Sequence, residues 1–575
     1  MSLSSIISSA SSALANTQLQ ISVANANVAN ADDLTYTKKS VSSTATTALN
    51  SASTSTIQRA ADSYLAKTVV KTAASAGYAS TIDTYMQSYD ASLGSVDGGD
   101  DLSSLLSSFT TALTTLSASP DSDAEKASLV SAATSLASGV SSLSSSIQDL
   151  RTQANDEIET TVDTINTTLK TLASLNDQIV SVTAQGGDAT SLLDQRDAAL
   201  TTLSGLIGVN SYTTSDNRLM VYTTGGDQLL GTTAATLSYD ASSSLSASSV
   251  YPDNISGITL NGKDITESIE SGQLGALITL RDETLVNEQA ELDNLASTLI
   301  SQINAITNAG TASPAPTTLT SASTVSGTDS FSASGSVRVA IVDSSGNTVS
   351  TEDIDLSNYS SIDDLVSALD AIDGLSASID SKGKLVLTAD DSANGVALGD
   401  IDASVGDDGQ GFSDYFGFND LFSGSTAADI AISSDLKSDY ARLTTGVLDT
   451  TSTLESGDRA ISSGDTTTLD ALTSMLSSQL SFAAAGDQGA KTVTLSSYTA
   501  SFVSGAATLI STAASDSESA TATYDAATSR LQNSTAVNVD EELAMLTTYQ
   551  SQYEANAQLV SMAKDLFDAL ISMVS

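Results

Sequence analysis

The sequence contains no histidine, cysteine or tryptophan, and only four of its 575 residues are proline. Without His or Cys there can be no Ser-His-Asp or Cys-His nucleophile, no Cys/His zinc site and no histidine that changes charge near neutral pH. Zero Cys also means no disulfides, which suits a cytosolic protein or an exported one that travels unfolded. These absences argue against most hydrolase mechanisms, and we expect no catalytic residues, no cofactor and no metal.

Basic residues and long apolar runs are also scarce. The chain has 21 Lys and Arg against 68 Asp and Glu, which gives a net charge of -47. A nucleic acid or an anionic membrane surface would require a basic patch, so we expect neither as a partner. The N-terminus lacks the basic region and continuous apolar core of a signal peptide, and no eighteen-residue apolar stretch predicts a membrane span.

Heptad repeats occupy both ends of the chain. Near the C-terminus the repeat consists of Val539, Leu546, Tyr553, Val560, Phe567 and Val574, with Tyr549, Ala563 and Leu570 three positions further on. Near the N-terminus it consists of Ile7, Leu14, Ile21 and Val28, with Leu3, Ala10, Thr17, Ala24 and Ala31 filling the second position. Such spacing predicts that the two ends pair as an α-helical coiled coil. Two ordinary amphipathic helices packed on a globular core are the alternative.

The middle of the chain predicts a mainly α fold with β insertions. Helical spacing is found at 57–89, 120–205 and 265–306, short strands at 209–237, and a mainly helical return at 427–536. A Ser/Thr/Pro-rich linker at 310–330 precedes a strand, strand, helix, strand, strand pattern. We therefore predict three domains: a terminal coiled coil of residues 1–36 and 537–575, a helical bundle of 37–311 and 423–536 with small β elements at about 209–262, and an inserted α+β domain of 312–422.

Three clusters offer a chemical interpretation beside a structural one. Acidic residues 97, 100 and 101 lack the alternating spacing of a calcium loop, so a solvated turn with a helix cap is favoured over weak calcium binding. The run 195–197 places Arg196 beside acids on a helix, which predicts a structural ion pair or an inter-helix hydrogen bond rather than catalysis. The aromatic run 411–422 is expected to pack where the inserted domain meets the bundle, with an aromatic ligand platform as the alternative.

Several segments resemble bacterial flagellar axial proteins, the family of rod, hook and hook-associated proteins. Asn27, Asn30, Tyr36 and Lys38 follow the family's Asn-x-x-Asn and Gly-Tyr-x-Arg motifs, with Thr at position 35 and Lys at 38. The segments 172–179, 192–197 and 272–283 and the aromatic run resemble the hook-filament junction members, and 540–571 is similar to the closing helix of the whole family.

That resemblance implies a structural, non-enzymatic component of the extracellular flagellum that is exported without a cleaved signal. It further implies self-association into a ring, with the terminal heptad residues as the assembly interface. Hook protein would lie on one side and a second junction protein or flagellin on the other, and an export chaperone is expected. Because isolated helices of this length are marginal in water, we expect the termini to order on assembly. A hook or rod subunit is the alternative among flagellar structural proteins. The alternatives from other classes are an acidic surface adhesin and an acid-pair glycosidase on the inserted domain.

Overall fold

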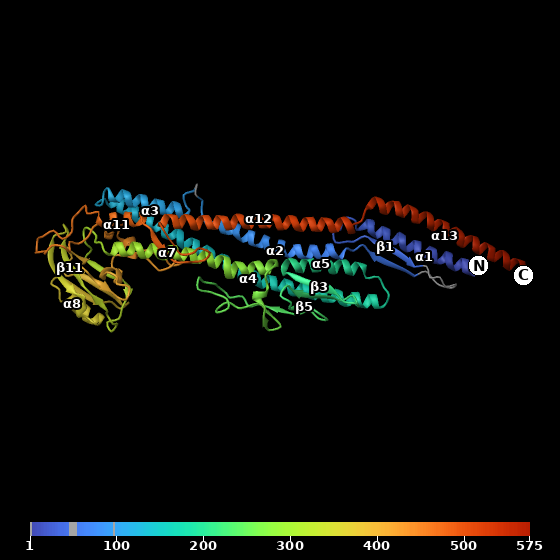
Figure 1. The fold of residues 1–575 in the computed structure, drawn as a ribbon, viewed down its shortest axis with the longest axis horizontal. Coiled ribbons are helices and arrows are strands. Elements are labelled where there is room, and N and C mark those ends of the chain that lie inside the picture. The colour runs from blue at the N-terminus through green and yellow to red at the C-terminus, as the bar shows by residue number, and fades with distance from the viewer. Residues whose placement is uncertain (1–2, 45–53, 96–97, 575) are drawn as a thin grey trace.

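The computed structural model describes residues 3–44, 54–95 and 98–574 of an elongated molecule. A β-rich unit occupies one end, long helices form the middle, and the two chain termini lie together at the other end (Figure 1). The mainly α fold with a β-rich insertion is confirmed.

Helices occur in the terminal pair, in the bundle and in the inserted unit. The long ones are α1 (Leu3–Ala29), α2 (Ser63–Ser92), α3 (Leu102–Ser117), α4 (Asp123–Ala184), α5 (Thr190–Leu206), α7 (Leu285–Asn308), α12 (Leu495–Thr535) and α13 (Val539–Val574). The shorter ones are α6 (Gly272–Thr279), α8 (Ile362–Asp370), α9 (Phe412–Phe416), α10 (Ser434–Ser438), α11 (Thr467–Ser477), the 3-10 turns η1 (Thr266–Ser268), η3 (Leu356–Asn358) and η4 (Tyr440–Arg442), and the π turn η2 (Leu280–Thr284).

Helix starts in the bundle follow the expected capping chemistry. The Asp62 and Asp101 carboxylates accept hydrogen bonds from backbone N–H groups in the first turns of α2 and α3, and Ser122 does the same for α4. Helix α4 is 62 residues long, so it spans about 93 Å at 1.5 Å per residue. Its apolar residues at helical spacing are buried and form much of the bundle core with α2, α3, α7 and α12.

Arg151 and Arg281 lie fully buried inside this bundle. Arg151 on α4 donates to the backbone oxygens of Arg281, Ser246 and Ser249 at 3.0, 3.0 and 2.6 Å. Arg281, in the π turn between α6 and α7, pairs with Asp282 at 2.6 Å. Carbonyl and carboxylate acceptors thus compensate for the desolvation of both guanidinium groups.

Small sheets cover one side of α4 and α5. They are β3 (Val209–Thr213), β4 (Leu219–Thr223) and β5 (Gln228–Leu230) in one sheet, and β6 (Leu237–Ser238), β7 (Thr259–Leu260) and β8 (Lys263–Asp264) in the other. Asn176 on α4 anchors the first sheet, because its amide bonds both the N–H and the C=O of Leu219 at 2.9 and 2.8 Å. Asn166 makes the same pair of contacts with Leu237 at 2.9 and 2.8 Å, so a second asparagine of α4 anchors the second sheet.

The inserted unit has its own apolar core between two antiparallel sheets and α8. One sheet has the order β12 (Thr348–Asp355), β11 (Ser336–Asp343), β15 (Asn394–Asp400); the other has β13 (Leu375–Ile379), β14 (Lys384–Ala389), β9 (Thr318–Thr324). The remaining short strands are β10 (Ala333–Ser334), β16 (Ser404–Val405), β17 (Phe422–Ser423), β18 (Ala431–Ile432), β19 (Leu480–Phe482) and β20 (Lys491–Val493). The predicted strand, strand, helix, strand, strand order appears as β11, β12, α8, β13 and β14.

Three element predictions are wrong in detail. Residues 54–59 form strand β2, paired with β1 (Lys39–Thr44), where the periodicity predicted the start of a helix. The predicted linker at 310–330 contains β9, whose Ser/Thr-rich sequence pairs with β14. The stretch 427–466, predicted to be mainly helical, holds only short elements, and its residues 448–461 pack on the outer face of β11 and β15.

Candidate assembly interface and elbow

Helices α1 and α13 run antiparallel and pack against each other, with the N- and C-termini at the same far end (Figure 1). On α1 the small residues Ala10, Thr17 and Ala24 are buried, because two helices approach most closely where side chains are small. The larger predicted seam residues, Ile7, Leu14, Ile21 and Val28, are only half-buried. The pair therefore leaves part of its apolar seam open.

The C-terminal heptad residues differ in solvent exposure along α13. Leu546, Tyr549, Tyr553 and Val560 are half-buried and Ala563 is buried, as expected for residues that face α1. Val539 at the start of the helix is 38% exposed, and Phe567 and Leu570 near its end are 49% and 57% exposed. The side chains of Leu3 and Val574 lie outside the part that the structure describes. Because α13 has 36 residues and α1 has 27, the end of α13 extends past its partner.

An apolar overhang results at the end of α13. We use this name for Leu566, Phe567, Leu570 and Met573, whose exposed fractions are 53%, 49%, 57% and 85%. Leu559 and Met562, at 48% and 58%, extend the same exposure toward the paired part of the helix. An apolar surface of this kind in a charged, acidic protein indicates an interaction site.

A β-hairpin arm leaves α1 and returns to the bundle at α2. Asn27 at the end of α1 holds its first strand: the amide bonds the Lys39 C=O at 2.8 Å and the Lys39 N–H at 3.0 Å, and it also accepts from the Tyr36 hydroxyl at 3.0 Å. Burial raises the pKa of Tyr36 to about 12, so its hydroxyl stays a donor. The motif residues Asn27 and Tyr36 thus shape the turn between helix and arm, whereas the Asn30 side chain donates to the Ala26 carbonyl of its own helix.

The carboxylate of Asp194 on α5 binds the arm to the bundle. It accepts from Lys39 Nζ at 2.9 Å, from Arg59 NH1 at 3.1 Å and from Thr37 Oγ1 at 2.7 Å. The second Arg59 nitrogen, NH2, reaches Asp197 at 2.7 Å. Because Asp194 is buried, these contacts work at a lower effective dielectric than a surface ion pair.

Lys38 connects the same arm to the terminal helix α13. Its Nζ lies 2.7 Å from Glu541 and 3.5 Å from Glu542, and the hydrogen bond with Glu541 raises the pKa of Lys38. The Lys38 backbone N–H donates to the Thr535 carbonyl at 2.7 Å, where α12 ends. We call residues 27–39, 59, 194, 197 and 535–542 the elbow, since they join the terminal pair, the arm and the bundle.

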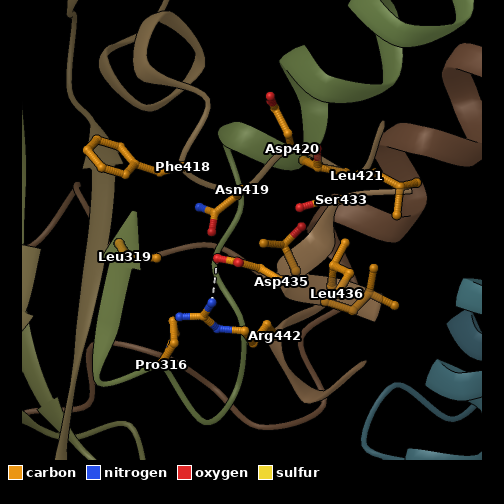
Figure 2. Close-up of a pocket in the computed structure, with 13 residues that line it drawn as sticks. Pro316, Leu319, Phe418, Asn419, Asp420, Leu421, Ser433, Asp435, Leu436 and Arg442 are labelled. Atoms are coloured by element: carbon orange, nitrogen blue, oxygen red, sulfur yellow. Dashed lines mark hydrogen bonds and ion pairs between the residues drawn. The ribbon is translucent and has the colours of Figure 1, made fainter. Parts of the chain in front are cut away.

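The inserted unit meets the bundle at a second joint, drawn in Figure 2. Arg442 pairs with Asp435 at 2.6 Å and also donates to the Thr318 carbonyl of β9, beside a cavity of about 20 Å³ that has room for one water. Asn308 at the end of α7 donates to Asp420 at 2.6 Å, and burial raises the pKa of Asp420 to about 6. This joint is held by polar contacts around a small cavity.

The aromatic run divides between the two sides of this joint. Phe412, Phe416 and Phe418 belong to the core of the inserted unit, whereas Phe422 belongs to the bundle core, with its ring 6.3 Å from that of Phe109. The run packs at the meeting of the two units, as predicted. All four phenylalanines are buried, which leaves their ring faces unavailable as a ligand platform.

The other candidate clusters have structural partners. Asp101 caps α3, Asp100 accepts from the Ser95 N–H at 2.8 Å, and Asp97 lies outside the described residues. Within the described residues no three acidic side chains are grouped closely enough to hold a metal ion. Arg196 is buried and donates to the Asn217 carbonyl at 2.6 Å, while Asp197 pairs with Arg59, so the predicted structural role of this run is confirmed.

Sequence reasoning missed Asp194, Lys39 and Arg59, which form the ion pairs of the elbow. Asp194 lies in a segment that resembles the junction proteins and Lys39 follows a motif residue, but neither position predicts a role. The only available signal is the adjacency of two lysines in a chain with 21 basic residues in total. Among the described residues, none of the helices is long and apolar enough to cross a bilayer.

Comparisons with known proteins identify two parts of the chain. Residues 86–316 match the family model of the helical domain of the flagellar hook-associated protein FlgK, and residues 531–573 match that of the C-terminal region of the flagellar basal body rod proteins FlgEFG. No curated protein sequence matches the chain. Among solved structures, the flagellar hook junction protein FlgK from Burkholderia pseudomallei is similar at 18% identity and a TM-score of 0.47, covering 81% of this chain and 99% of that one. The two family matches support a FlgK-type hook-associated protein, a family that forms a structural part of the extracellular bacterial flagellum.

Proposed function

We propose that this protein is a structural adaptor at the hook-filament junction and that it assembles with copies of itself through α1 and α13. The apolar overhang carries the proposal: it lies on the helix that matches the rod-family C-terminal model, and it is exposed in the single chain. The match to the FlgK helical domain favours this role over that of a hook or rod subunit.

Assembly would use the thirteen residues of the predicted interface: Leu3, Ile7, Leu14, Ile21, Val28, Val539, Leu546, Tyr549, Tyr553, Val560, Phe567, Leu570 and Val574. Half-buried members would complete their burial against neighbouring copies, and the exposed ones at the end of α13 would gain the most. Burying one such side chain fully contributes about 1.5–3 kcal/mol, so several per contact are needed to offset the entropy lost on association.

The partners and the route follow from the same proposal. Copies would form a ring on the hook protein and offer their other side to a second junction protein or to flagellin. The chain would leave the cell unfolded through the flagellar export channel, without a cleaved signal and with a chaperone. The absence of cysteine suits this route, because no disulfide has to form after export.

The three predicted domains remain the proposed division of labour. The terminal pair, 1–36 with 537–575, would assemble; the bundle, 37–311 with 423–536, would set the spacing; and the inserted unit, 312–422, would lie outside. The helix pair at one end of the molecule and the inserted unit at the other support this arrangement (Figure 1).

Localisation on isolated flagella tests the function directly. An antibody to the inserted unit should mark a single band at the hook tip, and cells that lack the protein should make hooks, lose filaments and release flagellin into the medium. A coat along the whole hook would indicate a hook subunit instead, and a label over the cell surface would indicate an adhesin. Normal filaments in the deletion strain would disprove the junction role.

A paired substitution tests the assembly surface. Replacing Leu566 and Leu570 by Ser should abolish incorporation at the hook tip while the helical content of the purified protein stays unchanged. Replacing Ser561 and Ser572 by Ala, two changes on the same helix that remove no apolar surface, is the matched control and should incorporate normally. Removal of 539–575 should leave a soluble, folded remainder that does not assemble. Incorporation of the Leu566/Leu570 variant or of the truncated protein would contradict the proposal.

A further inference from the structure

The elbow contains a buried carboxylate on a bundle helix whose donors all lie on the arm. Asp194 is 6% exposed and sits on α5 in the bundle, and its partners Lys39, Arg59 and Thr37 all lie on the arm. A buried carboxylate needs compensating donors, and two cations with a hydroxyl supply them. The arm and the bundle are therefore bound to each other through one side chain.

Two passages of chain join the bundle to the terminal pair, and both meet at the arm. One is the arm itself, between α1 and α2, and the other is the break between α12 and α13 at 536–538. The hydrogen bond from the Lys38 N–H to the Thr535 carbonyl ties the second passage to the first. Because consecutive side chains in extended backbone point to opposite faces, Lys38 reaches α13 while Lys39 reaches Asp194.

We propose that Asp194 is the positioning residue of the elbow, which fixes the direction in which the terminal helix pair leaves the bundle and so sets the geometry in which copies assemble. The second half of this statement rests on the proposed function, and the first half does not. Asp194 acts through the arm, since its hydrogen-bond donors lie on β1, on β2 and on the residues just before β1.

The absence of cysteine makes this measurable in the full-length monomer. Two cysteines introduced at exposed positions, Ser42 on the arm and Thr171 on α4, would be the only thiols and would carry spin labels. A second pair, Thr547 on α13 with Thr171, reports the terminal helix. Pulsed dipolar spectroscopy then gives the distance distribution of each pair.

Asp194→Asn should broaden the arm-to-bundle distribution and add a longer distance. The substitution replaces one carboxylate oxygen by an NH2 group, which cannot accept a hydrogen bond from Lys39 or Arg59. The matched control is Asp177→Asn, which removes the exposed ion pair with Arg218 on the same bundle and should leave the distribution unchanged. If Asp194→Asn lowers the helical content, the Arg59→Gln variant is measured in its place. This variant leaves the carboxylate with two donors, so it should broaden the same distribution, but less.

Each outcome decides one half of the inference. An unchanged arm-to-bundle or helix-to-bundle distribution in the elbow variant, or an equal broadening in the Asp177 control, overturns the positioning role. A broadened distribution with normal incorporation at the hook tip overturns the link to assembly geometry while the junction function stands. Failure of the unaltered protein to localise at the hook tip disproves the proposed function and leaves the monomer distances valid.

Discussion

The buried carboxyl group of Glu288 makes the stability of the bundle depend on pH. Glu288 on α7 is 5% exposed and accepts from the Tyr89 hydroxyl at 2.6 Å. Burial, with Glu291 and Asp487 nearby, raises the pKa of Glu288 from 4.5 to about 7. One pKa unit corresponds to about 1.4 kcal/mol, so the ionised form costs the folded state about 3 kcal/mol relative to the protonated form.

The sign follows from proton linkage. Between pH 4.5 and about 7 the folded state binds more protons at Glu288 than the unfolded state, so the stability that this group contributes is complete below pH 4.5 and is lost as the pH rises through 7. Glu288→Gln keeps an oxygen acceptor for Tyr89 and removes the titration. We expect the variant to match the unaltered protein near pH 4.5 and to be more stable at pH 8 by up to about 3 kcal/mol.

Urea unfolding followed by circular dichroism at 222 nm measures this difference, because most helices lie in the bundle. Taking variant minus unaltered protein at each pH removes the contributions of the other acidic residues. Glu283→Gln makes the same chemical change at an exposed position in the adjoining π turn and is the control. A Glu288→Gln difference that is equal at pH 5 and pH 8 would refute the burial argument.

Three further changes test the packing of the bundle and its joint. Gly77→Ala would push a Cβ into the Gly205 carbonyl where α2 and α5 cross, so urea unfolding should show a loss of about 1–3 kcal/mol, whereas Gly205→Ala meets only ordinary contacts and should be nearly neutral. Phe109→Ala empties a fully buried ring position and should cost about 3–5 kcal/mol in the same assay. Asp420→Asn removes a carboxyl group whose pKa burial raises to about 6, so at pH 7.5 it should slow proteolysis at the joint of the inserted unit, with no effect at pH 4.

Local patterns predicted much of the helical architecture. The heptads identified both terminal helices, because two helices that wrap around each other need an apolar side chain about every 3.5 residues. The acidic turn that ends at Asp101 marked the start of α3, and the strand, strand, helix, strand, strand pattern marked the hairpins of the inserted unit. In each of these cases neighbours in the sequence determine the structure.

Errors arose where partners distant in the sequence determine the structure. Strand β2 exists because β1 pairs with it, and β9 exists because β14 supplies its hydrogen bonds. Thr favours strands, but Ser is common in turns and linkers, so a mixed Ser/Thr run does not by itself separate the two. The elbow could not be predicted, since Lys39 and Asp194 are 155 residues apart and an ion pair leaves no periodic signal. The exposure of Phe567 depends on the unequal lengths of α1 and α13, which the heptads did not reveal.

The elbow would determine the relative orientation of assembled copies, and the overhang would determine how strongly they bind. Helix α1 has 27 residues and is therefore about 40 Å long, so a rotation of about 10° at the elbow would move the far end by about 7 Å, more than one helical turn. Neighbouring helices pack ridges into grooves, and a shift of one turn changes which side chains meet. Asp194 would thus decide whether the seams of neighbouring copies are in register, and Phe567 with Leu570 would decide how strongly they bind once they are. Elbow variants should therefore produce disordered assemblies, whereas overhang variants should produce none.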